Sequence, residues 1–219
     1  MRSTATGFFI HRRAYSIKAK LLTFYTLEEG SLSFLHYPSK KNPALIPFSK
    51  YEIEYDAKAS LNSILGLSLV DPANHWHTNP QKLAVAYFIA DVVNQTTQIK
   101  HQDIPAFDVL LRVESILSKD PNNFFIPLQF LNLWMEVLGI LPEPLQQANA
   151  FDVSEGVFLS KTQGFDVGAI TWNELLQNKC VEDKNALKQC FSLMISYCSM
   201  HAPNFNATST LEILKQMFS

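Results

Sequence analysis

The chain has 219 residues, of which 47% are hydrophobic and 17% are charged. This composition is sufficient for buried cores and excludes a disordered chain. No uninterrupted apolar segment approaches the roughly 20 residues that cross a bilayer, and the N-terminus lacks the pattern of a secretory signal. We therefore expect a cytoplasmic protein.

Charge is unevenly distributed along the chain. The formal net charge is −2, but residues 1–50 contain eight Lys or Arg against Glu28 and Glu29, a net of +6. Residues 51–219 contain ten basic and eighteen acidic residues, a net of −8. A basic head on an acidic body predicts an anionic partner for the head, nucleic acid first and a membrane surface second. The alternative is that surplus lysines protect strand edges from aggregation.

The basic head has the pattern of five short strands with little helical signal. Gly30 follows two acidic residues in a turn, where a glycine can take positive φ. Residues 18–26 before that turn are rich in β-forming residues, and residues 31–35 after it alternate polar and apolar, so the pair indicates a hairpin. The expected strands cover residues 7–11, 18–26, 31–35, 45–55 and 63–70. Five strands in about seventy residues are typical of a small barrel, so we predict a β domain over residues 1–72.

The acidic body, residues 73–219, is predicted to be mainly helical. Asn79 before Pro80 is a strong helix start, and further helices are expected over residues 103–118, 123–139 and 183–201. A short β-hairpin is expected near residues 150–160. Thr171 and Glu174 have capping-box spacing and predict the start of a short helix. The fold class is therefore α+β.

Motifs for catalysis and metal binding are lacking. The seven glycines form no phosphate-binding loop, and there is no nucleophile elbow or H-E-x-x-H motif. His75 and His77 could supply half of a metal site, but packing is the simpler interpretation. The three cysteines are not spaced as a disulfide framework. We expect no catalytic residue, no metal and no cofactor; a hydrolase or transferase would need acids or histidines that converge in a pocket of the helical body.

The basic head instead carries residues that suit DNA. Lysines and arginines can follow phosphates, while aromatic rings stack on bases. The candidates for phosphate contacts are Arg12, Arg13, Lys18, Lys20, Lys40 and Lys41. The candidates for stacking are His36 and Tyr37; Phe34 is a third ring, for which a core position is the better interpretation.

Several motifs, taken in order, resemble the RecO family of bacterial recombination mediators. In the head they are GFFIH at 7–11, YTLEEGSLSF at 25–34, LIPF at 45–48 and EIEY at 52–55. In the body they are LGILP at 138–142, FDVSEGVF at 151–158, YCSMH at 197–201 and STLEIL at 209–214. The resemblance covers nearly the whole chain, and the order and spacing of the motifs make it specific.

The resemblance implies an N-terminal five-stranded OB-fold barrel followed by a mainly helical domain. It also implies a recombination mediator in DNA repair that binds single- and double-stranded DNA, anneals complementary strands and helps to load the RecA recombinase. The implied partners are RecR and the C-terminal tail of the single-stranded-DNA-binding protein, without covalent chemistry and without a membrane. The protein would be associated with the nucleoid when active.

The chain departs from the family pattern at three points. Many relatives hold zinc with four cysteines, but residues 143–162 contain none, so we predict no zinc. The loop at residues 36–41 is less basic than is usual, which keeps open a second hypothesis, an adaptor for RecR and the single-strand-binding protein with weak DNA binding. Gln129 stands where some relatives have an arginine for the acidic tail. The candidates for partner contacts are Leu128, Gln129, Phe130, Leu133 and Trp134.

Overall fold

The computed structural model describes residues 1–38, 43–58, 61–71, 76–98, 101–119, 125–206 and 208–218. The chain forms two compact units, one from Met1–Phe124 with Ala207–Ser219 and the other from Phe125–Asn206. The domain boundary expected at residue 72 lies outside the described residues. It remains a prediction.

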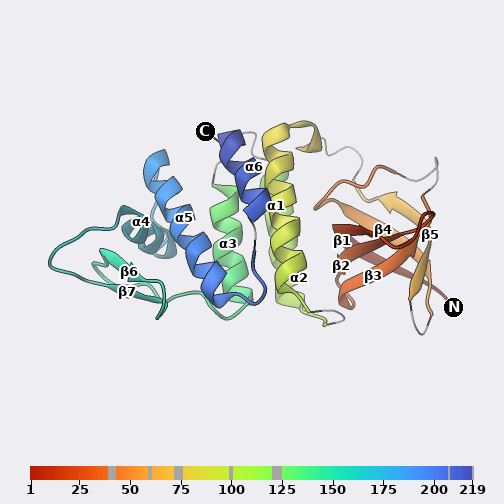
Figure 1. The fold of residues 1–219 in the computed structure, drawn as a ribbon, viewed down its shortest axis with the longest axis horizontal. Coiled ribbons are helices and arrows are strands. Elements are labelled where there is room, and N and C mark those ends of the chain that lie inside the picture. The colour runs from red at the N-terminus through yellow and green to blue at the C-terminus, as the bar shows by residue number, and fades with distance from the viewer. Residues whose placement is uncertain are drawn as a thin grey trace. The chain divides into compact units, whose positions relative to one another are not determined.

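The first unit contains a closed five-stranded barrel (Figure 1). Its strand order is β1-β2-β3-β5-β4, and β4 pairs with β1 to close it. All pairs are antiparallel except β3 with β5. This confirms the expected OB-fold barrel, followed by helices, and the α+β class. The strands are β1 (Arg2–Ala14), β2 (Lys20–Thr26), β3 (Gly30–His36), β4 (Lys50–Asp56) and β5 (Asn62–Leu69).

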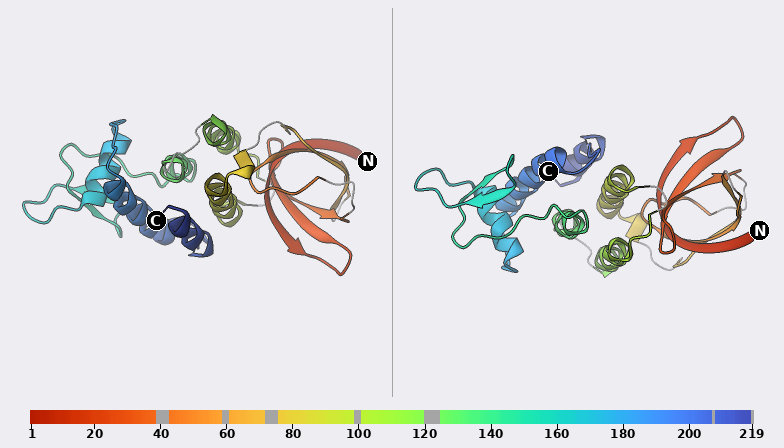
Figure 2. Two further views of the ribbon diagram at one scale, coloured as in Figure 1. Left: turned by 90° about the horizontal axis from the view of Figure 1, so that it is seen from above. Right: turned by 90° about the horizontal axis from the view of Figure 1, so that it is seen from below.

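Strand β1 is long enough to pair with two neighbours in succession. Arg2 to Phe8 pair with β4, and Gly7 to Ala14 pair with β2. The register shifts between Phe9 and His11, as it does at a β-bulge, which bends a strand and increases its twist. The end of β1 therefore leaves the barrel wall together with the start of β2, and the two strands form a projecting hairpin (Figure 2).

Strand β4 is shorter than the sequence pattern predicted. Residues 45–49 precede it as a loop, in which Phe48 takes a left-handed φ of 60° and is fully buried. Its ring stacks on Phe8 at a centroid distance of 5.1 Å. The Tyr51 hydroxyl donates to the Ala44 carbonyl oxygen at 2.7 Å and accepts from the Ile46 N–H at 2.9 Å. Phe48 is thus a core residue that is supplied by a loop.

The described residues of the first unit also form a short 3₁₀ turn and helices: η1 (Trp76–Thr78), α1 (Pro80–Thr96), α2 (Ile104–Lys119) and α6 (Thr208–Phe218). The expected start of α1 is confirmed, because the Asn79 side chain accepts from two N–H groups of the first turn. Helix α2 packs on the barrel, and the ring centroids of Phe107 and Phe8 are 5.5 Å apart. Beside it, Lys50 Nζ meets a carboxylate oxygen of Glu114 at 3.1 Å.

The second unit combines three helices with the expected hairpin. The elements are α3 (Ile126–Val137), β6 (Ala150–Asp152), β7 (Val157–Leu159), α4 (Val167–Leu176) and α5 (Lys184–His201). Phe151 and Phe158 of the hairpin pack against Trp172 of α4, at centroid distances of 4.8 and 5.6 Å. Tyr197 of α5 completes this aromatic cluster, and its hydroxyl donates to the Ile140 carbonyl oxygen at 2.7 Å.

The predicted start of α4 is wrong. Thr171 lies inside the helix and is buried, whereas Asp166 is the N-cap and accepts from the Ala169 N–H at 3.2 Å. The capping-box spacing was misleading because the side chain of an aspartate five residues earlier accepts a hydrogen bond from a backbone N–H of the first turn.

Gly30 should be intolerant of substitution. It has a φ of +66°, and a Cβ there would overlap the backbone carbonyl oxygen of His101. Gly164 has a φ of +81°, and no atom lies within 4 Å of a Cβ built there. A substitution at Gly164 therefore measures the cost of the backbone conformation without any steric overlap. We expect Gly164→Ala to lower the free energy of unfolding by about 1 kcal/mol and Gly30→Ala by about 3 kcal/mol, because overpacking is added. Chemical denaturation measures the free energy of unfolding of both variants. Equal losses would contradict the close approach of Gly30 to the backbone of His101.

Candidate nucleic-acid interface

The projecting β1–β2 hairpin carries exposed cations on both strands and on its tip. Arg12 and Arg13 lie at the end of β1, Lys18 lies in the turn and Lys20 begins β2, all exposed. No acidic residue occurs between positions 11 and 27. Among the described residues, the ion pairs of the first unit involve none of these four side chains. The hairpin is therefore a concentrated positive charge that is open to an anionic partner.

The tip of the hairpin has a defined conformation. Tyr15 and Ser16 donate their N–H groups to the Ala19 carbonyl oxygen at 3.1 and 3.0 Å. The Ser16 hydroxyl accepts from the N–H groups of Lys18 and Ala19. These bonds close the turn and leave Tyr15 61% exposed and Ile17 fully exposed.

Tyr15 and Ile17 are interface candidates that the sequence argument missed. An aromatic and an aliphatic side chain between cations can pack against bases, in the way that apolar wedges of DNA-binding proteins do. The signal that could have identified them is their position, since apolar residues in the turn of a hairpin cannot reach the barrel core.

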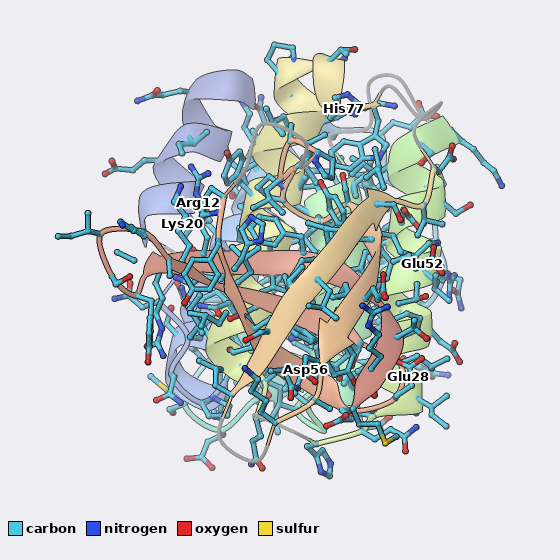
Figure 3. All side chains as sticks on the ribbon, turned by 90° about the vertical axis from the view of Figure 1, so that its right-hand side faces the viewer. Arg12, Lys20, Glu28, Glu52, Asp56 and His77 are labelled. Atoms are coloured by element: carbon cyan, nitrogen blue, oxygen red, sulfur yellow. The ribbon has the colours of Figure 1, made fainter. Side chains whose placement is uncertain are left out.

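Acidic groups lie elsewhere on the barrel. Arg12 and Lys20 lie on one side, while Glu28, Glu52 and Asp56 lie away from them (Figure 3). This segregation leaves the positive field of the hairpin uncancelled by the acids of the same barrel.

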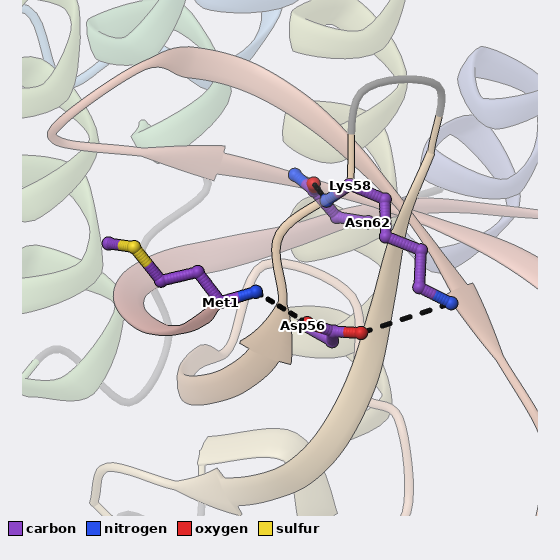
Figure 4. Close-up of polar contacts among 4 residues, drawn as sticks. All are labelled: Met1, Asp56, Lys58 and Asn62. Atoms are coloured by element: carbon purple, nitrogen blue, oxygen red, sulfur yellow. Dashed lines mark hydrogen bonds and ion pairs between the residues drawn. The ribbon is translucent and has the colours of Figure 1, made fainter.

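Asp56 is the centre of a polar cluster next to the β4–β5 turn (Figure 4). Its carboxylate accepts from the N-terminal ammonium of Met1 at 2.9 Å and lies 3.9 Å from Lys58 Nζ. The hydrogen bond from the ammonium lowers the pKa of Asp56. The backbone N–H of Lys58 donates to Asn62 Oδ1 at 3.2 Å. Because Lys58 lies beside a carboxylate, its charge is less available to an anion than the charges of the hairpin cations.

The residues expected at the end of β3 differ in accessibility. Tyr37 is 59% exposed and can offer its ring to a base, whereas His36 is only 4% exposed and Phe34 lies in the barrel core. Burial first, and then the nearby charge of Lys20, lower the pKa of His36. His36 is therefore excluded from the proposed surface. Lys40 and Lys41 lie outside the described residues.

The expected partner contacts on α3 are mainly core residues. Leu128, Phe130 and Trp134 are buried, and the rings of Phe130 and Trp134 stack at 5.6 Å. Gln129 and Leu133 are partly exposed. The side-chain oxygen of Gln129 is buried without a hydrogen-bond partner within the described part of the chain. Only these two of the five residues are placed to meet a partner in this conformation.

Across the residues that the structure describes, no group of three or more His, Cys, Asp or Glu could hold a metal ion. Burial raises the pKa of the Cys190 and Cys198 thiols to about 12, while Cys180 is exposed; His75 lies outside the described residues. Within the same ranges, none of the helices has the length and apolarity for crossing a membrane.

The burial of His36 should make stability depend on pH. Its folded pKa is lowered from the ordinary value of 6.5, so as the pH falls the unfolded chain takes up a proton on this ring more readily than the folded chain does. The free energy of unfolding should therefore fall as the pH decreases from 7.5 to 5.5. In His36→Asn this fall should be smaller, whereas His11→Asn, at an exposed position, should retain it. Urea denaturation at both pH values checks this, and an unchanged pH dependence in His36→Asn would contradict it.

Comparison with known proteins gives a consistent relationship. No protein-family model matches the chain. The chain is 23% identical over 247 residues to the DNA repair protein RecO of Phocaeicola vulgatus, with the whole of both chains covered. It is 23% identical over 245 residues to RecO proteins of two strains of Bacteroides fragilis, again with complete coverage. This end-to-end similarity agrees with the OB-fold barrel, the helical body and the ordered motifs, and it supports membership of the RecO family.

Proposed function

We propose that this protein acts in DNA repair by binding DNA through its barrel, with the β1–β2 hairpin as the main contact. The DNA repair role is supported by the RecO relatives, which are DNA repair proteins by name. The observation that carries the DNA contact is the hairpin itself. Arg12, Arg13, Lys18 and Lys20 lie exposed on it, without ion pairs among the described residues.

The mechanism follows from phosphate neutralisation. Each cation that meets a phosphate releases condensed counterions, and this gives affinity that depends little on sequence. The exposed rings of Tyr15 and Tyr37 add stacking to bases, which is equally tolerant of sequence. A surface of this kind can hold a strand while its base edges remain available for pairing.

Strand annealing and recombinase loading extend this proposal. Two complementary strands repel each other through their phosphates, and a compact group of cations reduces that repulsion where the strands meet. The family resemblance supports RecR and the C-terminal tail of the single-stranded-DNA-binding protein as partners, and the proposed activity involves no covalent chemistry.

The adaptor hypothesis is supported by one observation, the net charge of −8 over residues 51–219. An acidic body repels phosphates and limits DNA binding to the barrel. On this hypothesis the chain would bind RecR or the acidic tail while retaining little DNA at low salt.

Removal of two hairpin cations tests the proposed function. In Arg13→Gln with Lys18→Gln, two phosphate contacts are lost. The slope of log K against log salt should flatten by about 1.8 on duplex DNA and about 1.4 on a single strand. Fluorescence anisotropy with labelled oligonucleotides over a salt series measures this slope.

The matched control is Lys184→Gln with Lys188→Gln. These lysines are exposed on α5 of the other unit, and their loss changes the net charge equally. The control should leave the slope unchanged. If the hairpin variant and the control gave the same slope as the original protein, DNA would not follow the hairpin. If the original protein bound no DNA even at low salt, the adaptor hypothesis would replace the proposal.

A further inference from the structure

A pocket of about 280 Å³ lies at the base of the hairpin, within the first unit. One wall is β1, from Phe9 to Arg12. The loop before β4 forms the second wall with Leu45 and Pro47. Helices α1 and α6 form the third wall, with Tyr87, Ala90, Asp91 and Thr210.

Hydrogen bonds fix the walls of this pocket. The N–H of Phe48 donates to the Phe9 carbonyl oxygen at 2.8 Å, and the N–H of Phe9 donates to the Ser49 carbonyl oxygen at 2.9 Å. These bonds hold the loop against β1. The Thr210 hydroxyl donates to Asp91 Oδ2 at 2.9 Å, which holds α6 against α1. A pocket whose walls are tied in this way is preformed for its occupant.

The lining combines an aromatic face with positive charge. Tyr87 is 44% exposed although most of α1 is buried, so its ring is available at the edge of the pocket. Arg12 belongs both to the pocket and to the hairpin. Asp91 is the acid among the lining residues, and both of its oxygens accept hydrogen bonds, from Gln95 Nε2 and from Thr210.

We propose that this pocket holds one unstacked base of a single DNA strand whose phosphates follow the β1–β2 hairpin. The inference rests on the proposed function and adds a strand preference to it. Arg12 lies where a cation would meet the phosphate of that nucleotide, and the Tyr87 ring provides a surface for the base. A paired base enters such a pocket only after it is flipped out of the duplex, which is unfavourable. The protein therefore binds single-stranded DNA more tightly than duplex.

Substitution of Tyr87 tests the pocket. In Tyr87→Leu the apolar volume is largely kept and the aromatic face is lost. Affinity for a single-stranded oligonucleotide should fall roughly tenfold, within the range found for the loss of one stacking contact. Affinity for duplex should stay unchanged, and so should the salt slope on both, because no phosphate contact is removed. Tyr87→Phe should bind as the original protein does, and thermal unfolding of each variant verifies the fold.

A second measurement needs no variant. An oligonucleotide of the same length with abasic nucleotides keeps its phosphates but has no bases, so it should bind the original protein at least tenfold more weakly than the normal strand does. Equal binding of the two would overturn the pocket proposal, as would a Tyr87→Leu variant that lost nothing or lost single-strand and duplex affinity equally. In either case, salt-dependent DNA binding by the original protein would leave the proposed function standing. If the original protein bound no DNA, both the pocket proposal and the proposed function would be wrong.

Discussion

The architecture of the first unit depends on one strand that must pair with two neighbours in succession. The first half of β1 closes the barrel against β4, and its second half pairs with β2. The bulge between Phe9 and His11 separates the two halves and turns the strand. Two features follow from this division. The hairpin leaves the barrel with four cations and no acid, and the pocket forms where β1 passes helix α1.

Hydrophobic and ionic contacts then hold α2 against the same strand. Phe8 packs against Phe48 and Phe107, and Lys50 lies both over the Phe8 ring and next to Glu114. Burial raises the pKa of Glu114 even though Lys50 opposes the shift. Lys50 therefore contributes to the structure of the first unit. The hairpin cations make no such contact among the described residues and remain available to a ligand.

The sequence predicted the fold well because barrel strands and capped helices leave local signals. Alternating and β-forming residues indicated the five strands, Asn79 marked a helix start that is confirmed, and the helix expected over residues 183–201 is present with Asp183 as its N-cap. The loop at residues 45–49 was predicted as strand because a buried loop residue such as Phe48 has the same apolar signal as a residue of a paired strand. Thr171 was misleading because a better cap, Asp166, precedes it.

The candidate site was less predictable for physical reasons. The hairpin cations were identified from charge alone, since exposed basic residues are recognisable without a fold. Accessibility was not predictable: His36 is buried by its place at the end of β3, and Tyr15 and Ile17 are exposed by the turn. The pocket joins β1, a loop and two helices, including residues as distant as Arg12 and Thr210. Only tertiary structure brings these residues together.

The central claim is that DNA lies along the β1–β2 hairpin, and site-directed crosslinking tests it most directly. A photoreactive p-benzoylphenylalanine at Ile17, on the tip, is compared with one at Leu65, an exposed apolar residue on β5 of the same barrel. The account predicts strong crosslinking of a single-stranded oligonucleotide from position 17 and little from position 65, with the difference lost at high salt. Equal crosslinking from both positions, or crosslinking from position 65 alone, would contradict it.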